Sequence, residues 1–186
     1  MKYISIGAVI NPANESIVEV SHGGNTFKLT GDLAYVWLSG RFQFSHASTI
    51  LEQKALQQLL QMGLAKPCDG TEAGEYRALT QCTIVAAKTA RKEFFLPKEE
   101  QRILTWLREA GLVLTISELV FLMDRNIVPT RELLGSEHAQ KLVETIYTKE
   151  NIFDNLLDNQ MEHAQARDKT VKLIMKLLKK RKLVLL

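Results

Sequence analysis

Seven basic side chains and no acidic one lie in residues 169–186, a composition suited to contact with phosphates. The seven are Lys169, Lys172, Lys176, Lys179, Lys180, Arg181 and Lys182. At helical spacing, Lys172, Lys176 and Lys179 share one side of a helix whose other side is apolar. Few aromatic residues accompany them, which favours nucleic acid over an anionic membrane surface. The cluster could instead lie against the acidic segment 150–168 as a structural counter-surface.

A second candidate surface is the polar face of residues 48–62. Its candidate contacts are Gln53, Lys54, Gln57 and Gln58. A glutamine can bond bidentately to adenine, and Lys54 could meet a phosphate or a guanine edge. The exterior of an ordinary solvated helix has the same composition, so both interpretations stay open.

This polar face belongs to a helix that the apolar spacing predicts over the same residues. Ser45 or Ser48 is expected to cap the helix, and Gly63 is expected to stop it. The expected buried stripe is Leu51, Ala55, Leu56, Leu59 and Leu60.

Alternating apolar and polar residues predict three short strands before that helix. They lie over residues 3–10, 16–22 and 25–30. A short helix is expected next, with Thr30 or Asp32 at its start and Gly40 at its end. Residues 41–44 are expected to add a brief extended piece.

After Gly63 we expect two strands, over residues 64–68 and 75–86, around a glycine-containing turn. They would form a hairpin that projects from the end of the helix. Lys66 and Arg77 are the basic side chains that this hairpin would bring to a nucleic-acid backbone.

The second half of the sequence reads as nearly all helix. Pro97 suits a first helical turn, and Thr115 with Glu118 has the spacing of a capping box. The basic cluster forms the last helix, and a short terminal strand follows it. Residues 87–97 are the best candidate for a junction, which divides the chain into domains 1–90 and 91–186.

Residues 31–80 resemble the winged helix-turn-helix domains of bacterial transcriptional regulators. The pattern is carried by Leu59, Met62, Gly63 and Leu64, followed by Tyr76, Leu79 and Thr80. The resemblance implies an α+β winged-helix-like fold, with a recognition helix at 48–62 and a DNA-contacting wing at 64–82. The sequence departs from the family pattern because little room remains for the usual short middle helix.

Residues 1–66 also resemble, more weakly, the winged-helix-like domains that bind leader peptides. In such domains the peptide adds a strand to the edge of the N-terminal sheet. The two halves of the chain also share patterns, since "KALQQLLQMGLA" and "VKLIMKLLKKRKLV" both lead from a leucine-spaced helix to a short strand. We therefore consider a tandem winged helix.

Motifs for catalysis and for metal or cofactor binding are absent from the sequence. The histidines, at 22, 46, 138 and 163, are scattered, and Cys68 and Cys82 have no histidine near them. The N-terminal apolar run is too short for a secretory signal or a membrane span. We predict a cytoplasmic, non-enzymatic regulator without cofactor that binds double-stranded DNA and no membrane. A peptide- or protein-binding module is the alternative, and a homodimer is compatible with either.

Overall fold

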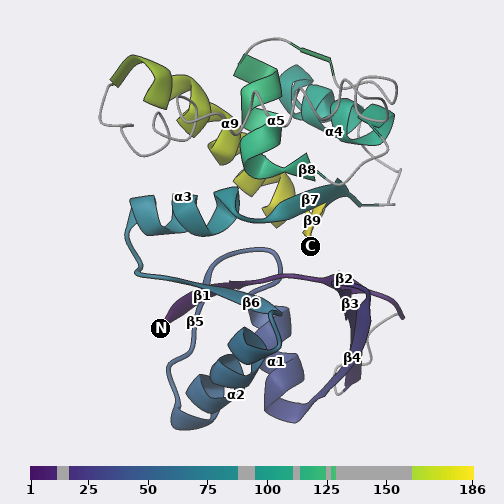
Figure 1. The fold of residues 1–186 in the computed structure, drawn as a ribbon, viewed down its shortest axis with the longest axis vertical. Helices are drawn as coiled ribbons and strands as arrows, with labels where there is room; N and C mark the ends of the chain where they lie inside the picture. The colour runs from purple at the N-terminus through teal and green to yellow at the C-terminus, as the bar shows by residue number, and fades with distance from the viewer. Residues whose placement is uncertain (12–16, 88–94, 111–113, 125–126, 129–160) are drawn as a thin grey trace.

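The computed structural model describes residues 1–11, 17–87, 95–110, 114–124, 127–128 and 161–186. The chain is α+β, as the sequence predicts, and its elements are stacked as two units along the longest axis (Figure 1). We call residues 1–68 the first unit and residues 72–186 the second unit. The helices expected between residues 129 and 160 lie outside the described residues.

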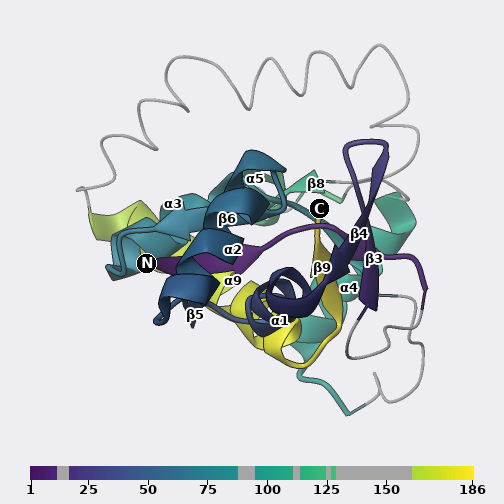
Figure 2. The same ribbon diagram turned by 90° about the horizontal axis from the view of Figure 1, so that it is seen from below.

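The first unit contains two small antiparallel sheets and two helices. Its elements are β1 (Lys2–Ser5), β2 (Ala8–Val9), β3 (Ile17–His22), β4 (Asn25–Thr30), α1 (Gly31–Ser39), β5 (Ser45–His46), α2 (Ile50–Gln61) and β6 (Ala65–Cys68). One sheet has the order β2-β3-β4, and in the other β1 lies between β5 and β6. The β3–β4 hairpin stands on the side of the molecule away from α2, as Figures 1 and 2 both show.

Three local expectations for this unit need correction. The predicted strand 3–10 is divided into β1 and β2 because Gly7 between them has a φ of 112°. The extended piece lies at Ser45–His46 rather than 41–44. The cap of α2 is Thr49, which forms a reciprocal capping box with Glu52, because Ser45 is already in β5.

The buried stripe of α2 is narrower than predicted. Ala55, Leu56 and Leu59 are buried and Leu60 is half-buried, but Leu51 is 62% exposed. At 100° per residue, Leu51 projects roughly a quarter of a turn away from the centre of the buried stripe. It therefore remains in solvent at the first turn of α2.

The predicted wing is wrong, because residues 72–80 form a helix, α3 (Glu72–Thr80). Thr71 caps this helix by accepting a hydrogen bond from the Gly74 N–H at 3.0 Å, and Asp69 in turn accepts from Thr71. Gly74, Ala78 and Leu79 are buried, which is the spacing of a helix that packs on one side. The strands before and after α3 belong to different sheets, so residues 64–82 form no hairpin.

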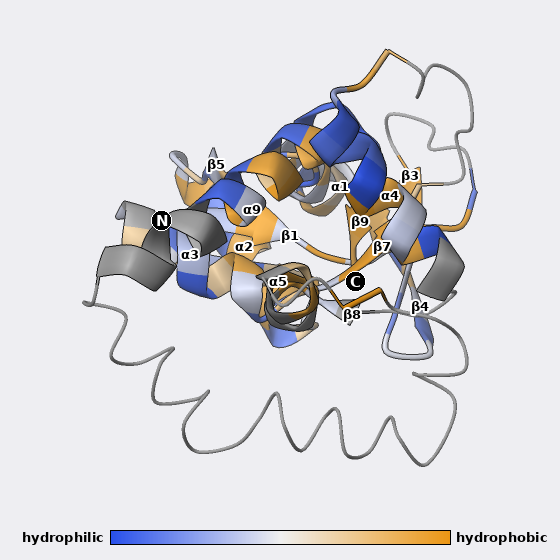
Figure 3. Ribbon diagram, turned by 90° about the horizontal axis from the view of Figure 1, so that it is seen from above, coloured by the Kyte–Doolittle hydropathy of each residue, from blue (hydrophilic) through white to orange (hydrophobic). Residues whose placement is uncertain are grey.

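The second unit is built around one three-stranded sheet. Its described elements are α3, β7 (Thr83–Ala86), α4 (Lys98–Ala110), β8 (Leu114–Thr115), α5 (Ile116–Asp124), α9 (Met161–Lys179) and β9 (Leu183–Leu185). Here β7 lies between β8 and β9, and all pairings are antiparallel. The helices pack around β7 and β9, whose residues are largely hydrophobic (Figure 3).

The two units repeat one pattern of strand pairing. In each, the strand that comes first is central. Its partners in the first unit, β5 and β6, lie before and after α2, and its partners in the second unit, β8 and β9, lie before α5 and after α9. The flanking hydrogen bonds also correspond. Ala47 N–H donates to Met1 O as Ile116 N–H donates to Cys82 O, both at 3.1 Å. Ile6 N–H donates to Leu64 O at 3.0 Å, as Ala87 N–H donates to Lys182 O at 2.8 Å.

The turn from helix to last strand is repeated as well. After α2, Gly63 has a φ of 73° and Leu64 N–H donates to Leu59 O at 2.8 Å. After α9, Arg181 has a φ of 57° and Lys182 N–H donates to Leu177 O at 2.9 Å. The two leucine-rich segments whose patterns match in the sequence therefore occupy equivalent places.

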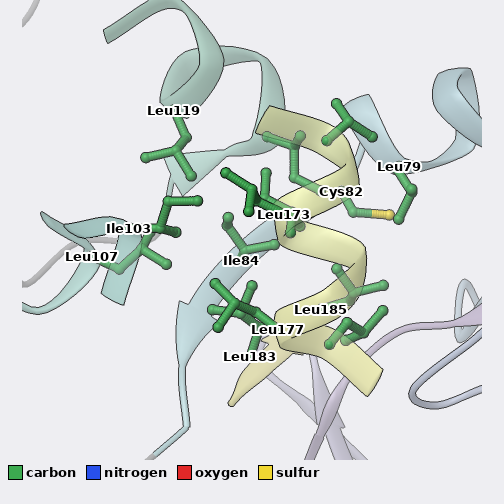
Figure 4. Packing of buried hydrophobic residues seen from close by; sticks show 14 of the residues in the cluster. Leu79, Cys82, Ile84, Ile103, Leu107, Leu119, Leu173, Leu177, Leu183 and Leu185 are labelled. Atoms are coloured by element: carbon green, nitrogen blue, oxygen red, sulfur yellow. The ribbon is translucent and has the colours of Figure 1, made fainter. Parts of the chain in front are cut away.

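The units are joined by a continuous apolar core. Ile4 and Ile6 of the first unit belong to the same buried cluster as α9 and β9, and Gly7 N–H donates to Leu185 O at 2.8 Å. Figure 4 shows this cluster, in which side chains from α3, α4, α5, α9 and the sheet converge. The first unit has a second cluster around Trp37, whose Nε1–H donates to Ile6 O at 3.0 Å.

Candidate nucleic-acid interface and an adjoining basic pocket

The basic helix predicted at the end of the chain is α9, and its two sides are segregated as expected. Val171, Ile174, Leu177 and Leu178 are buried in the core of the second unit. On the other side, Lys172, Lys176 and Lys179 are exposed. Within the described residues, these three lysines have no ion-pair partner. We call them the lysine row.

Two lysines that flank the lysine row form ion pairs with α4. Lys169 pairs with Glu99 and Lys180 pairs with Glu100, each at 2.6 Å. The first pair is exposed on both sides, but the Glu100 side chain is only 3% exposed. Glu100 is therefore a buried carboxylate whose charge Lys180 balances. Lys180, a candidate DNA contact, forms an ion pair with this carboxylate in the second unit.

The alternative partner of the lysine row within the chain is the acidic segment 150–168. The side chains of residues 150–168 lie outside the described residues. The acidic residues that are seen to reach α9 are Glu99 and Glu100, from the first turn of α4, and they engage Lys169 and Lys180.

The polar face of α2 is exposed as predicted, at Gln53, Lys54, Gln57 and Gln58. It belongs to the first unit, whereas the lysine row belongs to the second (Figure 1). Glu52, at the start of α2, accepts hydrogen bonds from the backbone N–H groups of Thr49 and Ser48, which hold its pKa below the usual range. A carboxylate thus lies at the N-terminal end of this face, so the later glutamines are the better-placed contacts to an anion.

The remaining two candidates, Lys66 and Arg77, are not brought together on a wing. Lys66 is half-buried in β6, opposite Ile4 of β1. Ile4 belongs to the core cluster of the second unit, and directly paired residues of antiparallel strands lie on the same face, so Lys66 faces the second unit. Arg77 is exposed on α3.

A pocket of about 400 Å³ lies where the end of α1 meets the end of α9. It is lined by Leu38, Ser39, Phe42, Gln43, Lys179 and Arg181. The Arg181 guanidinium lies 5.3 Å from the centre of the Phe42 ring, and the Arg41 guanidinium lies 4.6 Å from the same ring. Arg41 is also 5.4 Å from the Trp37 ring, so it backs the pocket from behind Phe42.

The positive charge around this pocket is not balanced locally. No carboxylate is among the described residues that line it. Burial, and secondarily the charge of Arg181, lower the pKa of Arg41. The Arg41 Nε atom is buried and has no hydrogen-bond partner among the residues that the structure describes. The sequence alone predicts only an extended piece at residues 41–44. The sequence "RFQF" there places a cation next to aromatic residues, and this is the signal that could have indicated the pocket.

Other kinds of site find little support in the described part of the chain. No group of three or more metal-ligating side chains comes together there. None of its helices has the length and apolar character needed to cross a membrane. Cys68 and Cys82 are free thiols, and burial raises the pKa of Cys82 to about 11, which makes it a poor nucleophile at neutral pH.

Comparison with known proteins yields no relative: no family model, curated protein or solved structure matches this chain.

Proposed function

We propose that the protein is a non-enzymatic regulator that binds double-stranded DNA in the cytoplasm through the lysine row of α9. The observation that carries the proposal is that Lys172, Lys176 and Lys179 are exposed, lie on one helix face and lack ion-pair partners among the described residues. Three adjacent lysines repel one another unless an anion lies against them. A phosphate backbone supplies that anion, and release of its counterions drives binding.

The dimensions of the lysine row suit a DNA strand. At 1.5 Å per residue, Lys172 and Lys179 are separated by roughly 10 Å along the helix axis. Successive phosphates of one strand rise by about 3.4 Å along the duplex axis, so three lysines face roughly three phosphates. In this proposal α2 reads bases with Gln57 and Gln58, which lie farther from the Glu52 carboxylate than Gln53 does.

A second candidate function is peptide binding at the edge of the N-terminal sheet. It is favoured by β4, an edge strand of six residues with no strand partner on its outer side among the described residues. An extended peptide could add to that edge through main-chain hydrogen bonds. Trp37 would not line such a groove, because its side chain extends from α1 into the core of the first unit and is fully buried.

The salt dependence of DNA binding tests the first proposal. Replacing Lys172 and Lys176 by Gln should flatten the slope of log K against log salt by about 2 units, because each neutralised phosphate contributes about 0.9. The matched control replaces Lys28 and Lys98, which are exposed on other elements, and removes the same charge. Fluorescence anisotropy with a duplex measures both slopes. If the two double variants have the same slope, the lysine row does not contact DNA.

The same salt series separates the two functions. Peptide addition at the β4 edge depends on main-chain hydrogen bonds and apolar contacts, and should respond weakly to salt. A protein that binds no duplex at low salt, but binds an extended peptide with little salt dependence, would favour the second function.

A further inference from the structure

The side chain of Arg181 stands in a turn where glycine fits better. The equivalent turn after α2 uses Gly63 at a φ of 73°, whereas Arg181 adopts a φ of 57° with matching hydrogen bonds. An L-residue with a side chain is strained in the left-handed region, and glycine is not. Such strain at a residue that lines a pocket points to a role for its side chain.

The guanidinium of Arg181 lies beside Phe42 at the pocket, although the residue as a whole is exposed. It stacks over Phe42, and Arg41 stacks on the same ring. Two like charges at one aromatic ring, with Lys179 beside them, generate a positive potential that no described carboxylate in the lining offsets. The buried, unpartnered Nε of Arg41 adds an unmet donor behind the ring.

The shape and chemistry of the pocket define what would fill it. Its volume of about 400 Å³ falls in the range of pockets for small ligands, which is about 300–1,000 Å³. A planar guanidinium binds phosphate oxygens through two parallel hydrogen bonds, and an ammonium adds a point charge. The walls formed by Leu38 and Phe42 leave room for the body of a small molecule attached to the phosphate.

We propose that this pocket binds the phosphate group of a small phosphate monoester through Arg181 and Lys179, with Gln43 as a further donor and Arg41 supporting the potential from behind Phe42. This site goes beyond the DNA proposal and does not depend on it. The two sites share Lys179, but the DNA test rests on Lys172 and Lys176, which do not line the pocket. A ligand there would bridge α1 and α9, and so the two units of the protein.

Binding of ribose 5-phosphate, measured by titration calorimetry at constant ionic strength, tests the proposal, with ribose as the ligand control. We expect saturable binding of ribose 5-phosphate and none of ribose. Arg181→Gly should weaken binding at least tenfold without lowering the thermal midpoint, because glycine accepts this backbone conformation. Lys172→Gln, on the same helix but outside the pocket, should bind like the parent protein.

Two outcomes would overturn this site. Equal affinity of Arg181→Gly and Lys172→Gln for ribose 5-phosphate would show that the pocket is not the binding site. Absence of ribose 5-phosphate binding, together with a flatter salt slope for DNA in Arg181→Gly, would assign Arg181 to the backbone of DNA instead. The DNA proposal would fail by a different result: an unchanged slope of log K against log salt for DNA binding in the Lys172 and Lys176 double variant.

Discussion

Loss of Lys180 should destabilise the protein far more than loss of the neighbouring exposed lysine. Lys180→Met keeps the aliphatic stem of the side chain but leaves the carboxylate of Glu100, which is 3% exposed, without its cation. Breaking a buried pair in this way typically costs about 3–5 kcal/mol. Glu100 also lies in the first turn of α4, where the helix dipole favours a negative charge by about 0.3–1 kcal/mol. We therefore expect a loss of about 2–4 kcal/mol in the free energy of unfolding.

Lys169→Met is the matched control, because Lys169 lies on the same helix and pairs with Glu99 at the same distance. That pair is 65% and 54% exposed, and exposed pairs contribute only about 0–1 kcal/mol. Urea unfolding of both variants, followed by far-ultraviolet circular dichroism, measures the difference. For a chain of this size, 1 kcal/mol corresponds to a shift of about 2–4 °C in the thermal midpoint.

Two results would refute this reasoning. If Lys180→Met is no less stable than Lys169→Met, Glu100 does not depend on Lys180 for its charge balance. If Lys180→Met unfolds normally but flattens the salt slope of DNA binding, Lys180 is a phosphate contact and belongs with the lysine row. A double variant that adds Glu100→Gln should recover part of the lost stability, because it removes the unpaired buried charge.

Three further predictions concern the core, the corrected wing and the thiol. Trp37→Ala should lower the unfolding free energy by about 3–5 kcal/mol, measured in urea, because the ring is fully buried; a near-neutral result would contradict its burial. Thr71→Ala should lower the free energy of unfolding by about 1 kcal/mol, measured by thermal unfolding, because it removes the cap of α3. If residues 64–82 formed a hairpin instead, this substitution would cause no such loss. Cys82 keeps its proton up to about pH 11 in the folded protein, while an ordinary thiol loses it near 9.0. Stability should therefore fall as the pH rises above about 9, more steeply than in Cys82→Ala, and equal pH profiles would refute this.

Local signals were sufficient for several elements. The alternation of Ile17–His22 and Asn25–Thr30 around Gly23 and Gly24 predicts β3 and β4 to within a residue, because the turn chemistry lies inside the hairpin. The last helix is also predicted, because its apolar residues and its lysines both recur at helical spacing. The short terminal strand after it is predicted as well.

Other features depend on partners that are distant in the sequence. The central place of β1 is set by β5 and β6, more than forty and sixty residues later, and no local pattern encodes it. For α3, the resemblance of "YRALT" to a wing strand outweighed the helical spacing of Gly74, Ala78 and Leu79. The pairing of Lys180 with Glu100 and the approach of Arg181 to Phe42 likewise arise only from tertiary packing.

The placement of each central strand at the start of its unit affects the order in which the chain can fold during synthesis. The first sheet can close once Cys68 has left the ribosome, because β1, β5 and β6 are then all present. β7 must wait for β9, which follows roughly a hundred residues later, or about 5–20 s at ordinary rates of translation. Throughout that interval the edge of β7, with Ile84 and Val85, lacks its native partner. A nascent chain paused before Leu183 would offer this edge to other strands, including the equivalent strand of another chain.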